Sequence, residues 1–403
     1  MRIEHLRIEN YRLFKQASLR DLPELAVFVG ANGVGKSTLF DVLAFLQDAL
    51  RDNVQVALAK RGGFKEVLSR GERGPIRFGL QARDGGDEPA TLRYELAIGL
   101  EEGRPIVQQE ALWLRSARSD QEACLLEFNC GVGFAVAHAS AYTAGAEAQR
   151  EALRLESPDI LAIKGLGQFD RFKGVARFCR WIERWHHADL QLAEARPSQE
   201  AGHAEHLSAK GDNLALVAQH LYRHHRDAFD EVLRRMTRRI PGLRSVEAAE
   251  TVDGRVVLRF QDGAFRDPFV SRHVSDGTLK MFAYLVLLHD PAPHPLLCIE
   301  EPESQLYPTL LEELAEEFRD YAQRGGQVLL STHSPDLLNG LSLEEIFYLR
   351  KQGGFTTVHR ASDAPLLRDL VAEGDLPRAL WKQGLLEGVH LPRNELSTPP
   401  AQA

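Results

Sequence analysis

A glycine-rich stretch near the N-terminus holds the residues best suited to chemistry. Residues 30–37 are GANGVGKS, with a lysine directly before a serine. The stretch fits G-x-x-x-x-G-K-[ST], a pattern that holds nucleotide phosphates when a strand precedes it and a helix follows it. The apolar run LAVFVG (25–30) comes before it, and leucines and a valine follow at helical spacing. The sequence therefore predicts a phosphate-binding loop.

Each part of this loop has an expected task. Glycine lets backbone N–H groups turn toward phosphate at a helix N-terminus, whose dipole favours anions. Lys36 is expected to reach the β- and γ-phosphates, and the Ser37 hydroxyl to ligate Mg²⁺. The predicted nucleotide site comprises Gly30, Ala31, Asn32, Gly33, Val34, Gly35, Lys36, Ser37 and Thr38.

Two carboxylates and a histidine follow two further apolar runs. Glu300 and Glu301 end the run LLCI (296–299), and His333 follows QVLLS (327–331). Hydrolysis needs one group that holds the metal and another that orients water and accepts its proton. We assign Glu300 to the metal and Glu301 to the water, and we expect His333 to hydrogen-bond the γ-phosphate. The alternatives are a polar strand end and a structural histidine.

The elements that position these residues fall into two kinds. The three apolar runs predict buried strands, whereas PIRFGLQ (75–81), TLRYELAI (91–98) and RVVLRF (255–260) alternate with period two, which is typical of half-exposed antiparallel strands. A helix is predicted after the loop and another after Pro308. The chain is therefore α/β, and its buried strands are separated in sequence by a long insertion.

Composition limits the class of protein. The 403 residues have a formal net charge of −8, which argues against a protein that coats DNA by its bulk charge, although a local basic groove stays possible. No apolar run is long enough to span a bilayer, and the N-terminus lacks the core of a signal peptide. The four cysteines form no CxxC pair. We expect a cytoplasmic protein with no membrane partner.

We predict four parts in the chain. Residues 1–150 form an N-terminal ATPase lobe with the phosphate loop and an antiparallel sheet, and 151–245 form a helical insertion. Residues 246–393 form a C-terminal ATPase lobe, and 394–403 a disordered tail.

The order of the motifs resembles the ABC-type ATPases of the SMC and RecF class, most closely the RecF-like ATPases of prokaryotes. The matching stretches are LRIENYRLFK (6–15), GANGVGKS, VSDGTLKMFA (274–283), CIEEPESQLYP (298–308) and STHSP (331–335). The resemblance implies a P-loop NTPase of the ABC/RecF type, with a mixed central sheet, an antiparallel subdomain and a helical insertion. It implies ATP and Mg²⁺ as ligands.

The same resemblance implies a nucleotide sandwich between two subunits. Ser275, Asp276 and Gly277 match the family's signature, which would meet the γ-phosphate bound on the opposite subunit. The alternative for this stretch is a helix N-cap without a ligand. Glu300 departs from the family, where aspartate is commoner. The family's glutamine loop has no clear counterpart, and KRGGFKEVL (60–68) covers that neighbourhood.

The middle of the chain carries arginines and histidines. Two basic stripes are candidate DNA contacts, and the alternative is a solvated face paired with local acids. They comprise Lys173, Arg177, Arg180 and Arg184, and then Arg234, Arg235, Arg238 and Arg239. The histidines at 186, 187, 203, 206, 220, 224 and 225 are expected at the surface, because no Cys or Asp completes a plausible metal-ligand set.

Three functions remain. The first is a Mg²⁺-dependent ATPase whose homodimer clamp opens and closes on DNA in repair, recombination or DNA-directed defence. The second is a nucleotide-gated scaffold that hydrolyses slowly and regulates a separate effector such as a nuclease. The third, the ATPase subunit of a membrane transporter, is disfavoured by the long insertion and the glycine-poor signature.

Overall fold

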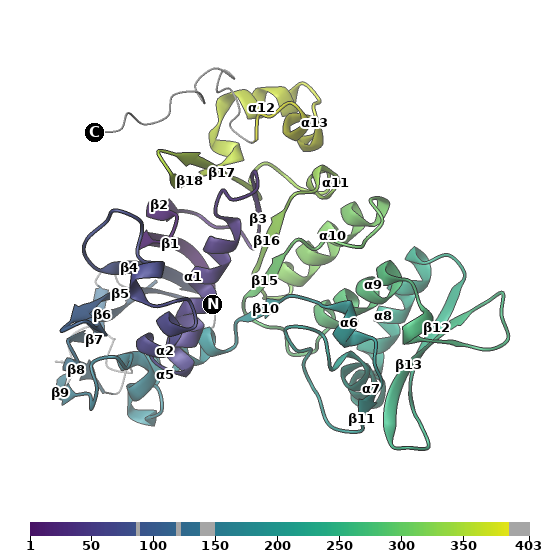
Figure 1. Cartoon of the computed structure of the whole chain (residues 1–403), viewed down its shortest axis with the longest axis horizontal. Helices are drawn as coiled ribbons and strands as arrows, with labels where there is room; N and C mark the ends of the chain where they lie inside the picture. Colours follow the sequence, from purple (N-terminus) through teal and green to yellow (C-terminus); the bar gives the residue numbers. More distant parts are fainter. Residues whose placement is uncertain (86–88, 118–121, 138–149, 387–403) are drawn as a thin grey trace, which may run out of the picture.

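The computed structural model describes residues 1–85, 89–117, 122–137 and 150–386. In Figure 1 a strand-rich lobe lies on one side, a helical layer on the other, and the central strands between them. The tail expected at 394–403 lies outside the described residues.

The central sheet is mixed. Its order is β10-β15-β16-β3-β17-β18, and all neighbouring strands are parallel except β17 and β18. The strands are β3 (Leu25–Val29), β10 (His186–Ala188), β15 (Leu297–Glu300), β16 (Val328–Thr332), β17 (Ile346–Gln352) and β18 (Phe355–Arg360). The three predicted buried strands are confirmed, and they meet although they are far apart in sequence.

β3 shows why these runs are apolar throughout. All five of its residues are buried: Ala26 and Phe28 face one core, whereas Leu25, Val27 and Val29 face the other. Because successive strand residues point to opposite faces, a strand covered on both sides has no polar position.

The N-terminal lobe is an antiparallel sheet ordered β2-β1-β4-β5-β6-β7-β8-β9. Its strands are β1 (Arg2–Tyr11), β2 (Phe14–Leu19), β4 (Ile76–Asp84), β5 (Ala90–Glu101), β6 (Arg104–Ser116), β7 (Glu122–Asn129), β8 (Val132–Val136) and β9 (Arg150–Arg154). The period-two prediction is confirmed, since Ile76, Phe78 and Leu80 are buried and alternate with partly exposed residues. Helix α1 (Lys36–Arg51) packs on this core with α2 (Val54–Ala59).

A third, small sheet contains the last predicted antiparallel strand. β13 (Arg255–Asp262) pairs with β12 (Leu243–Glu250), β11 (Gln199–Glu200) and β14 (Phe269–Val270). The helical layer beside it consists of α7 (Leu214–His224), α8 (Arg226–Arg239), α9 (Asp276–Leu288) and α10 (Thr309–Gln323). The remaining helices are α3 (Phe64–Val67), α4 (Ala162–Leu166), α5 (Lys173–Glu183), α6 (Leu192–Ala195), α11 (Pro335–Leu338), α12 (Pro365–Ala372) and α13 (Pro377–Lys382).

The segment expected as a helical insertion, 151–245, is divided between these layers. Helix α5 packs on α1, and its Phe178 and Trp181 are buried in the core of the N-terminal lobe. Strand β10 joins the central sheet beside β15. Helices α7 and α8 belong to the opposite layer (Figure 1). The domain boundaries drawn from the sequence stay a prediction.

Candidate functional site

The glycine loop joins β3 to α1 in a conformation that requires glycine. Gly30, Gly33 and Gly35 all have positive φ, and α1 begins directly afterwards at Lys36. A Cβ on Gly35 would lie 2.8 Å from the Thr356 hydroxyl oxygen, closer than side chains pack. That hydroxyl donates to the Val34 carbonyl at 2.6 Å, so β18 closes against the loop. The loop is therefore held from outside its own strand and helix.

Lys36 lies along the loop. Its ammonium donates to the Gly30 carbonyl at 2.7 Å and to the Ala31 carbonyl at 3.1 Å, and the side chain is buried. Val34 is also buried. The residues of the predicted site that line the adjacent cavity, of about 200 Å³, are Asn32, Gly33, Gly35, Lys36, Ser37 and Thr38.

The carboxyl end of β15 brings the first glutamate to the loop. The Ser37 side chain lies beside the Glu300 carboxylate, close enough to influence its pKa. Desolvation by the surrounding protein raises the pKa of Glu300, the Ser37 hydroxyl lowers it, and the nearby Glu301 and Asp189 raise it further. A hydroxyl and a carboxylate in contact are the oxygen ligands that a hard cation such as Mg²⁺ prefers. A cation here would also relieve the crowding of negative charge.

Glu301 and His333 form the second pair. Glu301 has a left-handed backbone (φ 47°), and its N–H donates to the Ser331 carbonyl at 2.9 Å. Its Oε1 lies 3.5 Å from His333 Nε2, and both residues line the cavity of the glycine loop. Glu303 accepts the His333 N–H at 2.7 Å and so orients the turn that follows β16. Three separate motifs therefore meet around one cavity.

The signature stretch lies apart from this cavity. Ser275 is the N-cap of α9, where its hydroxyl oxygen accepts the Thr278 N–H at 3.3 Å. Asp276 forms an ion pair with Arg196. A Cβ on Gly277 would lie 3.1 Å from the Gln305 carbonyl, so the start of α9 packs on the segment after the acidic strand. Ser275 and Asp276 are exposed, and neither lines the cavity of the loop in its own chain.

A second cavity, of about 660 Å³, adjoins the acidic strand end and contains residues that the sequence did not suggest. Asp189 and Gln191 follow β10 directly and line this cavity together with Glu300 and Glu301. The Gln191 amide donates to the Asp189 carboxylate at 2.9 Å. The candidate stretch 60–68 lines neither cavity. β10 has three residues, too few for a periodic pattern, so the sequence offered no signal for it.

Lys280 enters the same cavity from α9. The side chain is buried, and burial lowers its pKa, although Glu303, Asp189 and Glu301 act in the opposite direction. This lysine links the signature helix electrostatically to the acidic strand end.

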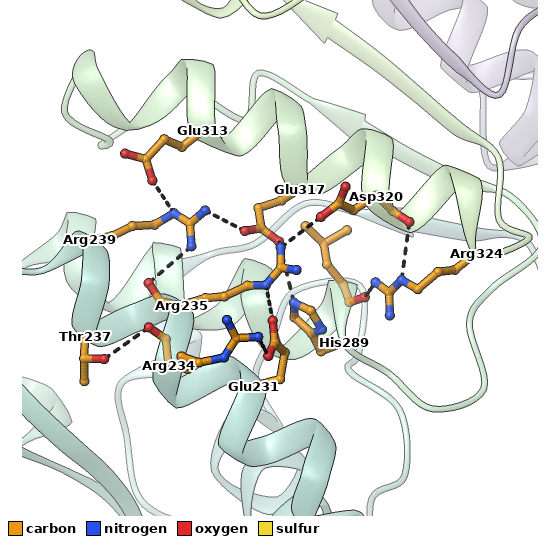
Figure 2. Close-up of polar contacts among 11 residues, drawn as sticks. Glu231, Arg234, Arg235, Thr237, Arg239, His289, Glu313, Glu317, Asp320 and Arg324 are labelled. Atoms are coloured by element: carbon orange, nitrogen blue, oxygen red, sulfur yellow. Dashed lines mark hydrogen bonds and ion pairs between the residues drawn. The ribbon is translucent and has the colours of Figure 1, made fainter.

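The second basic stripe is largely ion-paired within the chain (Figure 2). Arg235 contacts Glu231, Glu317 and Asp320, and Arg239 contacts Glu313 and Glu317. Glu317 is 1% exposed and binds both guanidinium groups where α8 packs beside α10. Arg235 and Arg239 were predicted as DNA contacts, but the buried Glu317 and the more exposed Glu231, Asp320 and Glu313 pair with them, which corresponds to the alternative of a face paired with local acids. Arg234 pairs with Glu231, and Arg238 is exposed.

The first basic stripe has the expected exposure. Lys173, Arg177 and Arg180 lie on the solvent face of α5, and Arg184 follows its end. Arg177 pairs with Asp84 at 2.5 Å, and Arg184 donates to the Pro293 carbonyl at 3.2 Å. The aromatic side chains of α5 face the core.

The surface prediction for the histidines is wrong in two respects. His186 and His187 lie in β10, where each has a buried Nε2 without a hydrogen-bond partner. His206 Nδ1 lies 2.6 Å from Asp290 Oδ2, so an aspartate does accompany the histidines. Asp290 is more than 80 residues away in sequence, and spacing gave no sign of the contact.

Two family descriptions match the chain. Residues 1–79 match the AAA ATPase domain, and residues 170–339 match the AAA domain described as a putative AbiEii toxin of a Type IV TA system. The second match contains the signature, the acidic strand and His333. Neither family model spans half of the chain.

A relative and several solved structures are also similar. The DNA replication and repair protein RecF of Renibacterium salmoninarum is 36% identical over 84 residues, which cover 20% of this chain and 21% of that protein. The SMC head bound to the C-terminal winged-helix domain of ScpA has a TM-score of 0.52 at 12% identity, over 89% of this chain and 98% of that one. The SMC head of Thermotoga maritima has a TM-score of 0.47 at 12% identity, over 89% of this chain and 99% of that one.

The described part of the chain contains no helix that is both long enough and apolar enough to cross a membrane. The fold, the order of the motifs and the family matches agree with one another. The chain has a fold similar to that of SMC head domains, and two of its segments match AAA ATPase-domain models, so it resembles the RecF/SMC-like ABC-type ATPases.

Proposed function

We propose that the chain binds and hydrolyses ATP with Mg²⁺, and that two copies close around two nucleotides to form a clamp that acts on DNA. The observation that supports this best is that Ser37, Glu301 and His333 line the cavity of the glycine loop, with Glu301 3.5 Å from His333 and Glu300 beside Ser37. These are the groups that phosphoryl transfer to water needs, and they come from three distant parts of the sequence.

Each residue then has a task at the γ-phosphate. Lys36 leaves its carbonyl partners for the phosphate oxygens, and loop N–H groups hold the remaining charge. Ser37 and Glu300 would hold Mg²⁺, which when bound would neutralise phosphate charge. Glu301 orients the water and accepts its proton, while His333 donates a hydrogen bond to the γ-phosphate.

The second copy supplies the signature. Ser275 is exposed at the N-terminus of α9, where helix N–H groups favour an anion. It lines no part of its own chain's loop cavity, so a γ-phosphate bound to a partner is the ligand that its position suits. ATP would then add contacts between copies, and hydrolysis would remove them.

Light scattering with size exclusion tests the clamp. Glu301→Gln keeps the shape of the side chain but removes the base, so it should form a dimer with ATP and a monomer without it. Adding Ser275→Arg to that variant should abolish the dimer, because a long cation replaces the serine at the contact. ATP binding by the double variant, followed by fluorescence of a labelled nucleotide, should persist. An oligomeric state that ATP does not change would refute the clamp.

A second candidate function is a nucleotide-gated scaffold that regulates a separate effector protein with slow turnover. The internal ion pairs of Arg235 and Arg239 favour it, because they remove part of the candidate DNA surface. ATP turnover with and without DNA separates the two functions. Strong stimulation by DNA supports the clamp, and negligible turnover in both conditions supports the scaffold.

A further inference from the structure

Three side chains at the far end of β15 from Glu300 come together in a way that the nucleotide site does not use. His206 lies between β11 and α7, whereas Asp290 and His294 lie between α9 and β15. One ligand atom of each lies within 4.8 Å of the other two. Among the described residues, no other group of three or more His, Cys, Asp or Glu side chains is close enough to hold a metal ion.

Hydrogen bonds select the tautomer of His294. Its Nδ1 lies 3.2 Å from the Arg184 carbonyl oxygen. Because a carbonyl only accepts, Nδ1 carries the proton and the lone pair is on Nε2. That Nε2 is buried and has no hydrogen-bond partner in the described structure. A buried acceptor without a partner costs about 1–3 kcal/mol of folding free energy, so a ligand bound to this nitrogen would remove that cost.

The ring of His294 is packed against a second imidazole. The ring of His186 stacks on it with the centroids 4.4 Å apart. His186 Nε2 is likewise buried and unpartnered. Neutral imidazole is the form that binds metals. A carbonyl that accepts the other ring N–H, as Arg184 does here, is the usual support of a metal-binding histidine.

Hydrogen bonds hold all three residues in place. The Tyr321 hydroxyl donates to the His294 carbonyl at 3.0 Å, and the Asn213 amide donates to the His206 carbonyl at 2.9 Å. The Ala292 N–H donates to Asp290 Oδ1 at 2.8 Å, which leaves Oδ2 directed to His206. The donor set is thus preorganised, and rotations of side chains are enough to adjust it.

We propose that His206, Asp290 and His294 form a binding site for a divalent transition metal such as Zn²⁺. Two imidazoles and a carboxylate suit Zn²⁺, with bonds of about 2.0–2.1 Å and water as a fourth ligand. Ligand atoms then lie about 3.4 Å apart, which the present separations allow with small movements. In the metal-free state the Nδ1–H of His206 donates to Asp290 instead.

The location of the proposed metal site indicates what a bound metal would do to the protein. The metal would tie the connection that precedes α7 to the connection that leads into β15, and so join the helical layer to the central sheet. Glu300 and the glycine loop lie at the opposite, carboxyl end of the strands. The metal would therefore act on stability and on the relative position of the two layers, and it needs no nucleotide.

Metal content and thermal unfolding of the full chain test the proposal. After incubation with Zn²⁺ and removal of the excess, the wild type should retain one zinc per chain by mass spectrometry, and its melting temperature should rise with Zn²⁺ concentration. His294→Ala and the shape-conserving Asp290→Asn should each weaken zinc binding by at least about 10-fold. Co²⁺ in place of zinc should give the visible spectrum of a tetrahedral nitrogen and oxygen site.

The control is the double variant His220→Ala/His224→Ala. These two rings lie one helical turn apart on α7, with centroids 4.9 Å apart, and form an imidazole pair outside the proposed site that could also bind zinc. Retention of zinc by this variant, together with its loss in His294→Ala, supports the site. Loss of zinc in the control but not in His294→Ala would place the metal on α7 and overturn the proposal. A wild type that retains no zinc would also overturn it.

Discussion

Replacing Gly35 by alanine tests whether the glycine loop needs the conformation that it has. Gly35 has φ 109°, a region that costs an L-residue about 1–2 kcal/mol. The new Cβ would also lie 2.8 Å from the Thr356 hydroxyl oxygen. Relief of that contact breaks the 2.6 Å hydrogen bond to the Val34 carbonyl, a loss of about 0.5–1.5 kcal/mol. Together these effects come to about 1.5–3.5 kcal/mol, with about 2–3 kcal/mol as the central expectation.

In the free protein the variant loop relaxes to another conformation, and nucleotide binding then has to restore the original one. The dissociation constant for ATP should therefore rise by about 30- to 140-fold, since each 1.4 kcal/mol is a factor of ten. Titration calorimetry, or the fluorescence of a labelled nucleotide, measures this directly.

Gly325→Ala is the matched control. Gly325 has nearly the same φ, 105°, but a Cβ there meets no atom within 4 Å, and the residue follows α10 away from the loop. It should bind ATP like the wild type. Combining Gly35→Ala with Thr356→Ala removes the contacted oxygen and should recover part of the affinity. If Gly35→Ala binds ATP within about 3-fold of the wild type, the steric reasoning is refuted.

Three further predictions concern charge. Lys36→Ala should abolish ATP binding, measured by calorimetry, while the melting temperature without nucleotide stays within a few degrees of the wild type. Glu317→Gln should destabilise the fold by about 2–3 kcal/mol, because Arg239 and Arg235 then lose their buried charged partner. The control Glu316→Gln, on the exposed face of α10, should leave the stability nearly unchanged. Equal melting temperatures for the two variants would contradict the prediction. Burial alone would raise the pKa of Glu317, but His289, Arg239 and Arg235 outweigh it, so the pKa is lowered in the fold. The stabilisation by ionised Glu317 is therefore present above about pH 4.5 and is lost as the pH falls further. The difference in melting temperature between wild type and Glu317→Gln should disappear in acid.

Much of the fold could be predicted from local patterns. The glycine loop, the buried strands and the period-two strands are signals that neighbouring residues carry together, and the structure has them in the expected places. The resemblance, which rests on the order of the motifs, supplied the assignment of the signature. Glu301 and His333 were each predicted at the end of an apolar strand, and the structure places them 3.5 Å apart because the ends of parallel strands meet at one edge of the sheet.

Other features depend on contacts between distant residues. β10 is an element of three residues that is a strand only because β15 pairs with it, so Asp189 and Gln191 could not be assigned to the site beforehand. The spacing of the arginines on α8 predicted a surface for DNA, but Glu317 of α10 lies between Arg235 and Arg239 and pairs with both (Figure 2). Charge spacing shows which residues share a helix face, but it cannot show what packs against that face.

The sequence by itself determined the glycine loop, its strand and helix, and the acidic and histidine strand ends, because the required backbone angles and apolar periodicities are local properties. Only the tertiary structure decided that Ser37 lies beside Glu300, that β18 holds the loop through Thr356, and that His206 meets Asp290. Each of those contacts joins segments far apart in the chain, and which segments meet depends on how the sheets and helices pack as whole layers.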